Sequence, residues 1–139
     1  MSFERIFIDT SYVQAILDRR DALHERALAL RPFVERAAEF WLTDAILIEV
    51  GNALASRNRG AATEFIESCH LDRRFRVISV NKSLLLNALS LYRKHDDKTW
   101  GITDCLSFVV MKEQELTIAL TADRHFIQAG FRALLLENS

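Results

Sequence analysis

The chain has 139 residues, of which 50% are apolar, and its 18 Lys and Arg against 19 Asp and Glu give a formal net charge of −1. This length suits one compact domain over residues 1–139, and the apolar fraction supplies a core without disulfide or metal staples. The balanced charge excludes the globally basic character of most duplex-binding domains, so any contact with nucleic acid must depend on local patches or on a bound metal.

The first half of the chain alternates short apolar segments with amphipathic ones. Residues 3–8 form a short run of apolar and β-branched character, which predicts a buried strand, and residues 40–42 predict a second strand. The pattern predicts helices over 10–17, 21–34, 43–56 and 61–69. We expect Pro32 to kink or divide the second helix, and Gly60 to mark a break before the fourth.

The second half continues this alternation. Residues 75–80, 117–120 and 132–136 predict strands, and the polar segment 94–101 predicts a loop. Helices are expected over 81–94, over 123–129, and after Thr103, which would cap a helix that is apolar all round and therefore buried. Strands that alternate with helices predict an α/β sandwich with a central, mostly parallel sheet of about four to five strands.

No segment has the composition of an export signal or a membrane span. The N-terminus lacks the apolar region of a signal peptide, and no apolar stretch approaches the ~20 residues that cross a bilayer. We therefore expect a soluble, cytoplasmic protein with no membrane partner, in which Cys69 and Cys105 are reduced, packed thiols.

Four carboxylates fall at places that a parallel sheet brings together. Asp9 directly follows the first expected strand, Asp123 follows the strand at 117–120, and Asp104 opens the buried helix before it. Glu49 lies just off the apolar stripe of the helix at 43–56. Ligands of open α/β sheets gather at the carboxyl ends of the strands, and close carboxylates repel unless a cation or proton compensates. Hard oxygen ligands suit Mg²⁺ or Mn²⁺, which predicts a metal-dependent nuclease.

Each of these carboxylates also has a simpler structural interpretation. Asp104 and Asp123 stand at helix starts, where a carboxylate caps free N–H groups and favours the helix dipole. Asp9 fits a strand-to-helix turn, and Glu49 fits a solvated helix position. Asp9 is the hardest to explain in this way, because the apolar residues 6–8 beside it are expected to be fully buried.

Four segments together resemble a known family. They are residues 7–11, residues 43–54 around Glu49-Val50-Gly51, residues 97–108 around Thr103-Asp104-Cys105, and residues 120–126 around Thr121-Ala122-Asp123. In order and separation these segments are similar to those of PIN-domain proteins, specifically VapC-like toxins of toxin–antitoxin pairs. The resemblance covers nearly the whole chain and implies a PIN-like α/β/α sandwich.

The resemblance implies a Mg²⁺- or Mn²⁺-dependent endoribonuclease that cleaves single-stranded RNA, binds a small antitoxin protein and forms a homodimer. It implies catalytic and metal-binding roles, directly or through water, for Asp9, Glu49, Asp104 and Asp123. Asp9 and Asp104 match best as ligands. The hydroxyls that would support the ligands belong to Thr10, Ser11 and Thr121. A metal-bound water would attack the phosphorus in line, and no separate His or Lys base is required.

Other residues carry weaker signals. None of the four histidines, His24, His70, His95 and His125, has metal-site spacing, so surface or capping positions are expected, with His125 on the rim of the pocket. Trp100 is expected in core or dimer packing rather than stacked on a base. Candidate phosphate contacts, which are more often solvated, are Arg57, Arg59 and Lys98. One helix has more apolar side chains than a core stripe needs, which predicts self-association through Leu84, Leu85, Leu86, Leu89, Leu91 and Tyr92.

Three other functions fit parts of the pattern. A receiver-like signalling domain also gathers carboxylates around Mg²⁺, but it needs an acidic pair at the first strand exit, where Asp9 stands alone. A PIN fold that serves as a catalytically silent interaction module is the second alternative, although the acidic quartet is intact. A flap-type DNA nuclease on a related fold is the third, and the chain is short for its additional helices.

Overall fold

A parallel sheet forms the centre of the computed structural model, which describes residues 4–137. The sheet has five strands in the order β3-β2-β1-β4-β5, and every neighbouring pair is parallel. The strands are β1 (Arg5–Ile8), β2 (Glu39–Thr43), β3 (Phe75–Ile78), β4 (Ile118–Leu120) and β5 (Arg132–Ala133). The expected α/β architecture is therefore confirmed.

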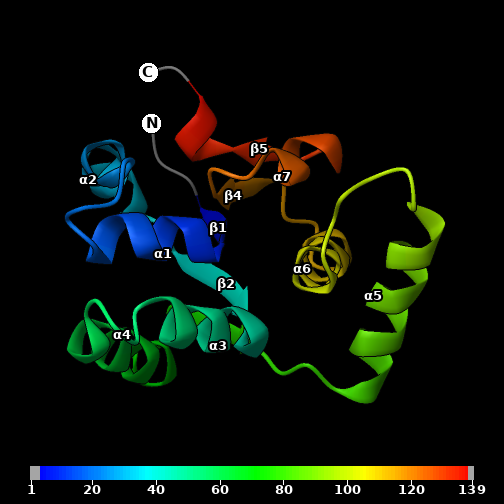
Figure 1. Cartoon of the computed structure of the whole chain (residues 1–139), viewed down its shortest axis with the longest axis horizontal. Helices are drawn as coiled ribbons and strands as arrows, with labels where there is room; N and C mark the ends of the chain where they lie inside the picture. The colour runs from blue at the N-terminus through cyan, green and yellow to red at the C-terminus, as the bar shows by residue number, and fades with distance from the viewer. Residues whose placement is uncertain (1–3, 138–139) are drawn as a thin grey trace.

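Seven α-helices and one short 3₁₀ helix are found in residues 4–137. The α-helices are α1 (Thr10–Leu17), α2 (His24–Val34), α3 (Asp44–Ala53), α4 (Arg59–Leu71), α5 (Lys82–Lys94), α6 (Ile102–Glu113) and α7 (Arg124–Gln128). The 3₁₀ helix is η1 (Leu134–Leu136). Figure 1 shows α1 to α4 gathered on one side of the molecule and α5 and α6 on the other. Helix α1 packs against α2 and α3, while α6 packs against α5, α7 and β2.

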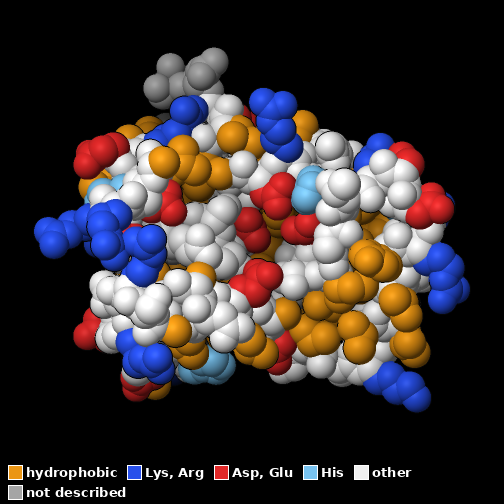
Figure 2. All heavy atoms as spheres, viewed as in Figure 1, with side chains coloured by type: hydrophobic (Ala, Val, Ile, Leu, Met, Phe, Trp, Pro, Cys, Tyr) orange, Lys and Arg blue, Asp and Glu red, His pale blue; other side chains and the backbone are white. Residues whose placement is uncertain are grey.

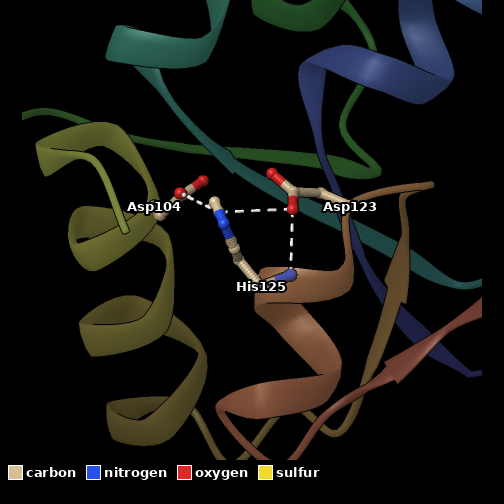
Figure 3. A group of neighbouring side chains, drawn as sticks. All are labelled: Asp104, Asp123 and His125. Atoms are coloured by element: carbon tan, nitrogen blue, oxygen red, sulfur yellow. Dashed lines mark hydrogen bonds and ion pairs between the residues drawn. The ribbon is translucent and has the colours of Figure 1, made fainter. Parts of the chain in front are cut away.

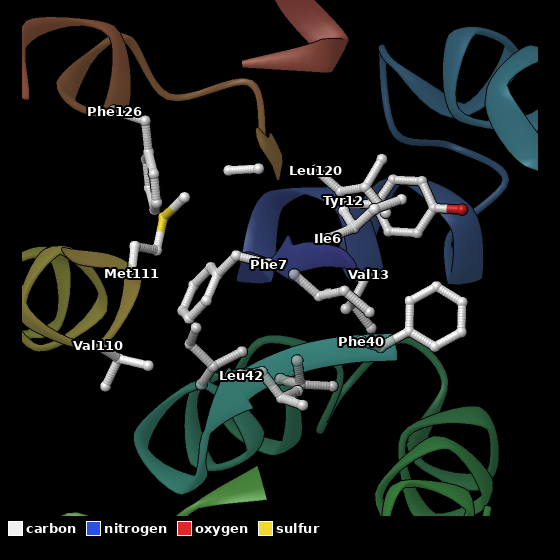
Figure 4. Close-up of a cluster of buried hydrophobic side chains, with 14 of the residues drawn as sticks. Ile6, Phe7, Tyr12, Val13, Phe40, Leu42, Val110, Met111, Leu120 and Phe126 are labelled. Atoms are coloured by element: carbon white, nitrogen blue, oxygen red, sulfur yellow. The ribbon is translucent and has the colours of Figure 1, made fainter. Parts of the chain in front are cut away.

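The central strand β1 and its neighbour β4 contribute fully buried side chains to the core. Ile6 and Phe7 of β1 and Leu120 of β4 are fully buried. Helices α6 and α7 add Met111 and Phe126, and the Phe126 ring lies 6.3 Å from that of Phe7 (Figure 4). Each side chain buried in this way contributes roughly 1.5–3 kcal/mol. Because this packing fixes β1 and β4, the residues that follow the two strand ends are held in a fixed relation to each other.

Two expected strands are shorter than the apolar runs suggested. The strand expected over 75–80 ends at Ile78, because the N–H of Val80 donates to Asp44 Oδ1 at 3.1 Å instead of to the sheet. The strand expected over 132–136 is wrong in its second half, since only residues 132 and 133 pair with the short β4. Leu134 and Leu135 are both buried, but they lie in η1, into which the chain turns after Ala133. Phe3, the first residue of the expected first strand, lies outside the described residues.

Helix boundaries also differ at three points. Helix α6 begins at Ile102 with Gly101 as its N-cap, so the expected cap at Thr103 is wrong. Pro32 does not divide α2, which continues to Val34. Because Pro32 lies in the last turn, its missing N–H costs the helix few hydrogen bonds. Gly60 lies inside the first turn of α4, where N–H groups have no intrahelical partner. That turn is capped by Asn58, whose Oδ1 accepts the N–H of Ala61 at 3.1 Å.

Candidate metal centre

The ends of β1 and β4 place two carboxylates at the same edge of the sheet. The strands are in register at Ile8 and Leu120, and the N–H of Asp9 continues the ladder by donating to the carbonyl of Leu120 at 3.1 Å. Asp9 is the N-cap residue of α1, and Asp123 is the N-cap residue of α7. This sheet edge therefore directs both side chains toward the same space, as expected for the carboxyl ends of parallel strands.

All four predicted carboxylates line one hollow of about 520 Å³, which also includes residues of α1 and α3. Asp104 reaches it from the first turn of α6, and Glu49 reaches it from the middle of α3. Figure 2 shows acidic side chains around a hollow in the centre of the face. The structure thus brings together residues that are separated by up to 114 positions, from 9 to 123, along the chain.

Asp9 is the most buried of these carboxylates, with only 8% of the residue exposed. Its Oδ2 accepts hydrogen bonds from Thr121 Oγ1 at 2.7 Å and from Ser11 Oγ at 2.9 Å. Burial raises the pKa of Asp9 to about 6, the hydroxyl bonds oppose that rise, and the neighbouring charge of Asp104 adds to it. The carboxylate is therefore held at a cost that a cation beside it would offset.

Glu49 is oriented by a hydroxyl of the opposite helix. Thr10 Oγ1 donates to Glu49 Oε1 at 2.6 Å, a bond that joins the start of α1 to α3. Ser11 and Thr121 are joined at 3.2 Å, and Ser11 Oγ also accepts the N–H of Ala122 at 3.0 Å. The three hydroxyls that the family resemblance implied, on Thr10, Ser11 and Thr121, thus all bond to a carboxylate of the hollow.

Asp104, Asp123 and His125 form a second cluster at the same hollow (Figure 3). His125 Nδ1 lies 2.8 Å from Asp104 Oδ2 and 3.3 Å from Asp123 Oδ1. One ligand atom from each residue lies within 4.8 Å of the other two, close enough to surround one metal ion. The sequence indicated His125 only as a rim residue, and this contact between α6 and α7 has no signature in the sequence.

Asp104 and Asp123 both accept backbone N–H groups at helix starts and belong to the cluster at the hollow. Asp123 Oδ1 accepts the N–H of His125 at 2.9 Å, and Asp104 Oδ2 accepts the N–H of Gly101 at 3.1 Å. The capping interpretation and the metal-ligand prediction therefore do not exclude each other. A carboxylate has about four lone-pair sites, so one bond to a backbone N–H leaves others for a ligand.

The donor chemistry of the hollow fits a hard divalent cation. Carboxylate oxygens predominate, with hydroxyl groups behind them, and both kinds of group suit Mg²⁺ and Mn²⁺. The single imidazole at the edge extends this set with a nitrogen.

Several side chains lie away from the hollow. Trp100 is 7% exposed and its Nε1 donates to Gln128 Oε1 at 2.9 Å, so the expectation of core packing is confirmed. Cys69 and Cys105 are free and buried, and burial raises the pKa of their thiols to about 12 and about 11. Among residues 4–137, no helix has both the length and the apolar character to cross a membrane.

Comparison with known proteins identifies a family and two solved structures with a similar fold. The family model of the PIN domain matches residues 6–132. The chain is 28% identical over 126 residues to the 23S rRNA-specific endonuclease VapC20 of Mycobacterium tuberculosis, covering 91% of this chain and 95% of that protein.

The solved structures agree with this match. The crystal structure of VapC20, described as a Sarcin-Ricin loop cleaving toxin, superposes with a TM-score of 0.80 at 27% identity, over 91% of this chain and 95% of that one. FitAcB from Neisseria gonorrhoeae has a TM-score of 0.59 at 18% identity, over 92% of this chain and 94% of that one, which shows a shared fold alone.

Proposed function

This chain belongs to the PIN domain family, and we propose that it is a metal-dependent endoribonuclease that cleaves single-stranded RNA as the toxin of a toxin–antitoxin pair. The observation that carries the proposal is the convergence of Asp9, Glu49, Asp104 and Asp123 on one hollow. The similarity of this chain to an rRNA-specific endonuclease, over 91% of the chain, supports RNA as the substrate class.

The chain's own residues would hold and orient the cation. Asp9 and Asp104 would bind it, with Glu49 and Asp123 completing the set directly or through water. Ser11 and Thr121 fix Oδ2 of Asp9, so this carboxylate presents one orientation to the hollow. A bound Mg²⁺ or Mn²⁺ would supply Lewis-acid stabilisation of the phosphate and activation of a water.

A track for the RNA backbone leads from the hollow toward the C-terminal ends of α1 and α3. A second depression of about 300 Å³ shares Gln14 and Ala53 with the acidic hollow and is lined further on by two arginines and two carboxylates, Arg20, Arg57, Asp18 and Asp21. Arg57 lies 3.5 Å from Asp18 and remains about half exposed, which fixes the guanidinium while it can still bind a phosphate oxygen. The acidic hollow would then hold the reacting phosphate and Arg57 a flanking one.

A partner protein would inhibit by displacing the cation, and not by charge alone. An Arg side chain inserted among Asp9, Glu49 and Asp104 would form charge-assisted hydrogen bonds in the place of the cation. This proposal of a small antitoxin rests on the acidic hollow and on the family to which the chain belongs.

A second copy of the chain would bind through α5. Leu84 and Leu91 of the six apolar residues proposed for self-association pack inward, with Leu84 only 7% exposed. The outward-facing members are Leu85, Leu86, Leu89 and Tyr92, with exposed fractions of 43%, 52%, 37% and 45%. Figure 2 shows hydrophobic side chains gathered over this side of the molecule. Their number on one helix supports the proposed homodimer.

Cleavage of a labelled single-stranded RNA tests the function. The protein, free of any partner, should cleave only with Mg²⁺ or Mn²⁺, and a chelator should abolish cleavage. Asp104→Asn should remove most activity, whereas a purely capping role predicts little change because the Asn side-chain oxygen can also accept the N–H of Gly101. Full cleavage by Asp104→Asn would overturn the mechanism, and metal binding without cleavage of any RNA would favour the silent-module alternative.

A further inference from the structure

The imidazole of His125 occupies a position that a metal ligand would take. Its Nδ1 faces the gap between Asp104 and Asp123, at 2.8 and 3.3 Å from their nearest oxygens (Figure 3). The backbone N–H of the same residue donates to Asp123 Oδ1 at 2.9 Å, so the ring and this carboxylate are fixed on one turn. The side chain is 25% exposed, which leaves the gap open to ions from solvent.

The other ring nitrogen has the partner that a ligating histidine needs. Nε2 lies 3.0 Å from Thr99 Oγ1, in the loop before α6. A hydroxyl both donates and accepts, so the neutral ring can carry its single proton on either nitrogen and keep this bond. With the proton on Nε2, the lone pair of Nδ1 points into the gap between the carboxylates. Histidines that bind metals commonly donate their second N–H to such an outer group, which fixes the ring.

We propose that His125 binds the divalent cation through Nδ1, together with Asp104 and Asp123, and that Thr99 holds the ring in the binding tautomer. This inference rests on the proposed function, because it concerns the same cation. It changes the expected selectivity of the site. Oxygen-only ligands suit Mg²⁺, whereas an imidazole nitrogen favours transition metals, so the mixed set favours Mn²⁺ over Mg²⁺.

The competing role for His125 is that of a hydrogen-bond donor alone. In that role Nδ1–H draws Asp104 and Asp123 together, and the cation binds elsewhere in the hollow. An Asn at this position retains an N–H donor near Nδ1 but lacks the imidazole lone pair. The donor role therefore predicts that His125→Asn keeps the metal preference of the wild type, and the ligand role predicts that it does not.

Metal binding, measured without RNA, separates these roles. Calorimetric titration with Mg²⁺ and Mn²⁺, and electron paramagnetic resonance of bound Mn²⁺, would be applied to the wild type, His125→Asn, His125→Gln and Thr99→Val. The matched control is His70→Asn, since His70 is exposed on α4 and its Nδ1 lies 2.9 Å from the carbonyl oxygen of Ile66 in the same helix. Circular dichroism would confirm that each variant is folded.

The wild type and His70→Asn should bind Mn²⁺ more tightly than Mg²⁺. Both His125 variants should lose Mn²⁺ affinity by about tenfold or more while Mg²⁺ affinity changes little, and Thr99→Val should lose an intermediate amount. Equal Mn²⁺ and Mg²⁺ affinity in the wild type, or an unchanged preference in folded His125→Asn and His125→Gln, would overturn the inference and leave the proposed function intact. A wild type that binds neither ion would instead overturn the proposed function.

Discussion

Asp9→Asn is expected to stabilise the metal-free protein at neutral pH. Burial raises the pKa of Asp9 from its ordinary 3.8 to about 6, against the hydrogen bonds from Thr121 and Ser11. A difference of this size between the unfolded and folded states corresponds to about 3 kcal/mol. Since Asp9 forms no side-chain cap bond with α1, the substitution removes no helix cap.

The sign follows from which state binds the proton more tightly. The folded pKa lies above the unfolded one, so the stability from this group is complete below about pH 4 and is lost as the pH rises to about 6. Asn does not ionise, so the variant loses no stability from this position over the same pH range. The free energy of unfolding of Asp9→Asn should therefore exceed that of the wild type by about 1–3 kcal/mol at pH 7.5. The lower figure allows for the cost of burying the new amide N–H groups of Asn. The difference should shrink as the pH falls toward 4.

Urea denaturation followed by circular dichroism measures this difference, with a chelator present and at both pH values. Asp21→Asn serves as the control, because Asp21 lies outside the acidic hollow and its bond to the N–H of Leu23 is one that Asn also accepts. Saturating Mn²⁺ at about 100 times its Kd should then stabilise the wild type by about 2.7 kcal/mol and the variant by less. A variant less stable than the wild type at pH 7.5 without metal, or a difference independent of pH, would refute the reasoning.

Three further outcomes are expected. Arg57→Ala should raise the KM for RNA several-fold with little change in kcat, measured by initial cleavage rates, because it removes a flanking phosphate contact; an unchanged KM contradicts the proposed track. Inhibition by an antitoxin should weaken as Mg²⁺ rises, and inhibition independent of Mg²⁺ excludes competition at the metal site. Light scattering should give a dimer mass for the wild type and a monomer mass for Leu86→Lys, since Leu86 is 52% exposed; a wild-type monomer at micromolar concentration contradicts the homodimer.

The sheet and the convergence of the carboxylates were predictable because both depend on local patterns. A buried parallel strand has a nearly continuous apolar run, and the residue after it must lie at the carboxyl edge of the sheet, as Asp9 does. The resemblance to the PIN domain is confirmed over residues 6–132. The metal-binding roles of the four carboxylates, and the single domain over 1–139, stay predictions.

The features that the sequence did not predict depend on pairing between distant segments. The chain leaves β5 for η1 after Ala133 although β4 continues to Leu120, and Leu134–Leu136 alone has the same apolar character as a strand. The position of the His125 ring depends on Thr99, which is 26 residues away and lies in a loop with no regular pattern. A pattern within one segment does not determine which distant side chain a ring or strand will contact.

The bonds that support the carboxylates explain how a metal-free hollow tolerates their repulsion. Thr121 and Ser11 donate to Asp9, Thr10 donates to Glu49, and backbone N–H groups donate to Asp104 and Asp123. Each bond stabilises the charged form, yet the pKa of Asp9 remains raised to about 6 because burial outweighs them. The same bonds restrict the rotamers of these carboxylate side chains, so a cation would bind them with little rearrangement. The fold thus retains an electrostatic cost that protonation of Asp9 or a bound cation would remove, and such a trade of stability for activity is expected of the catalytic site that we propose.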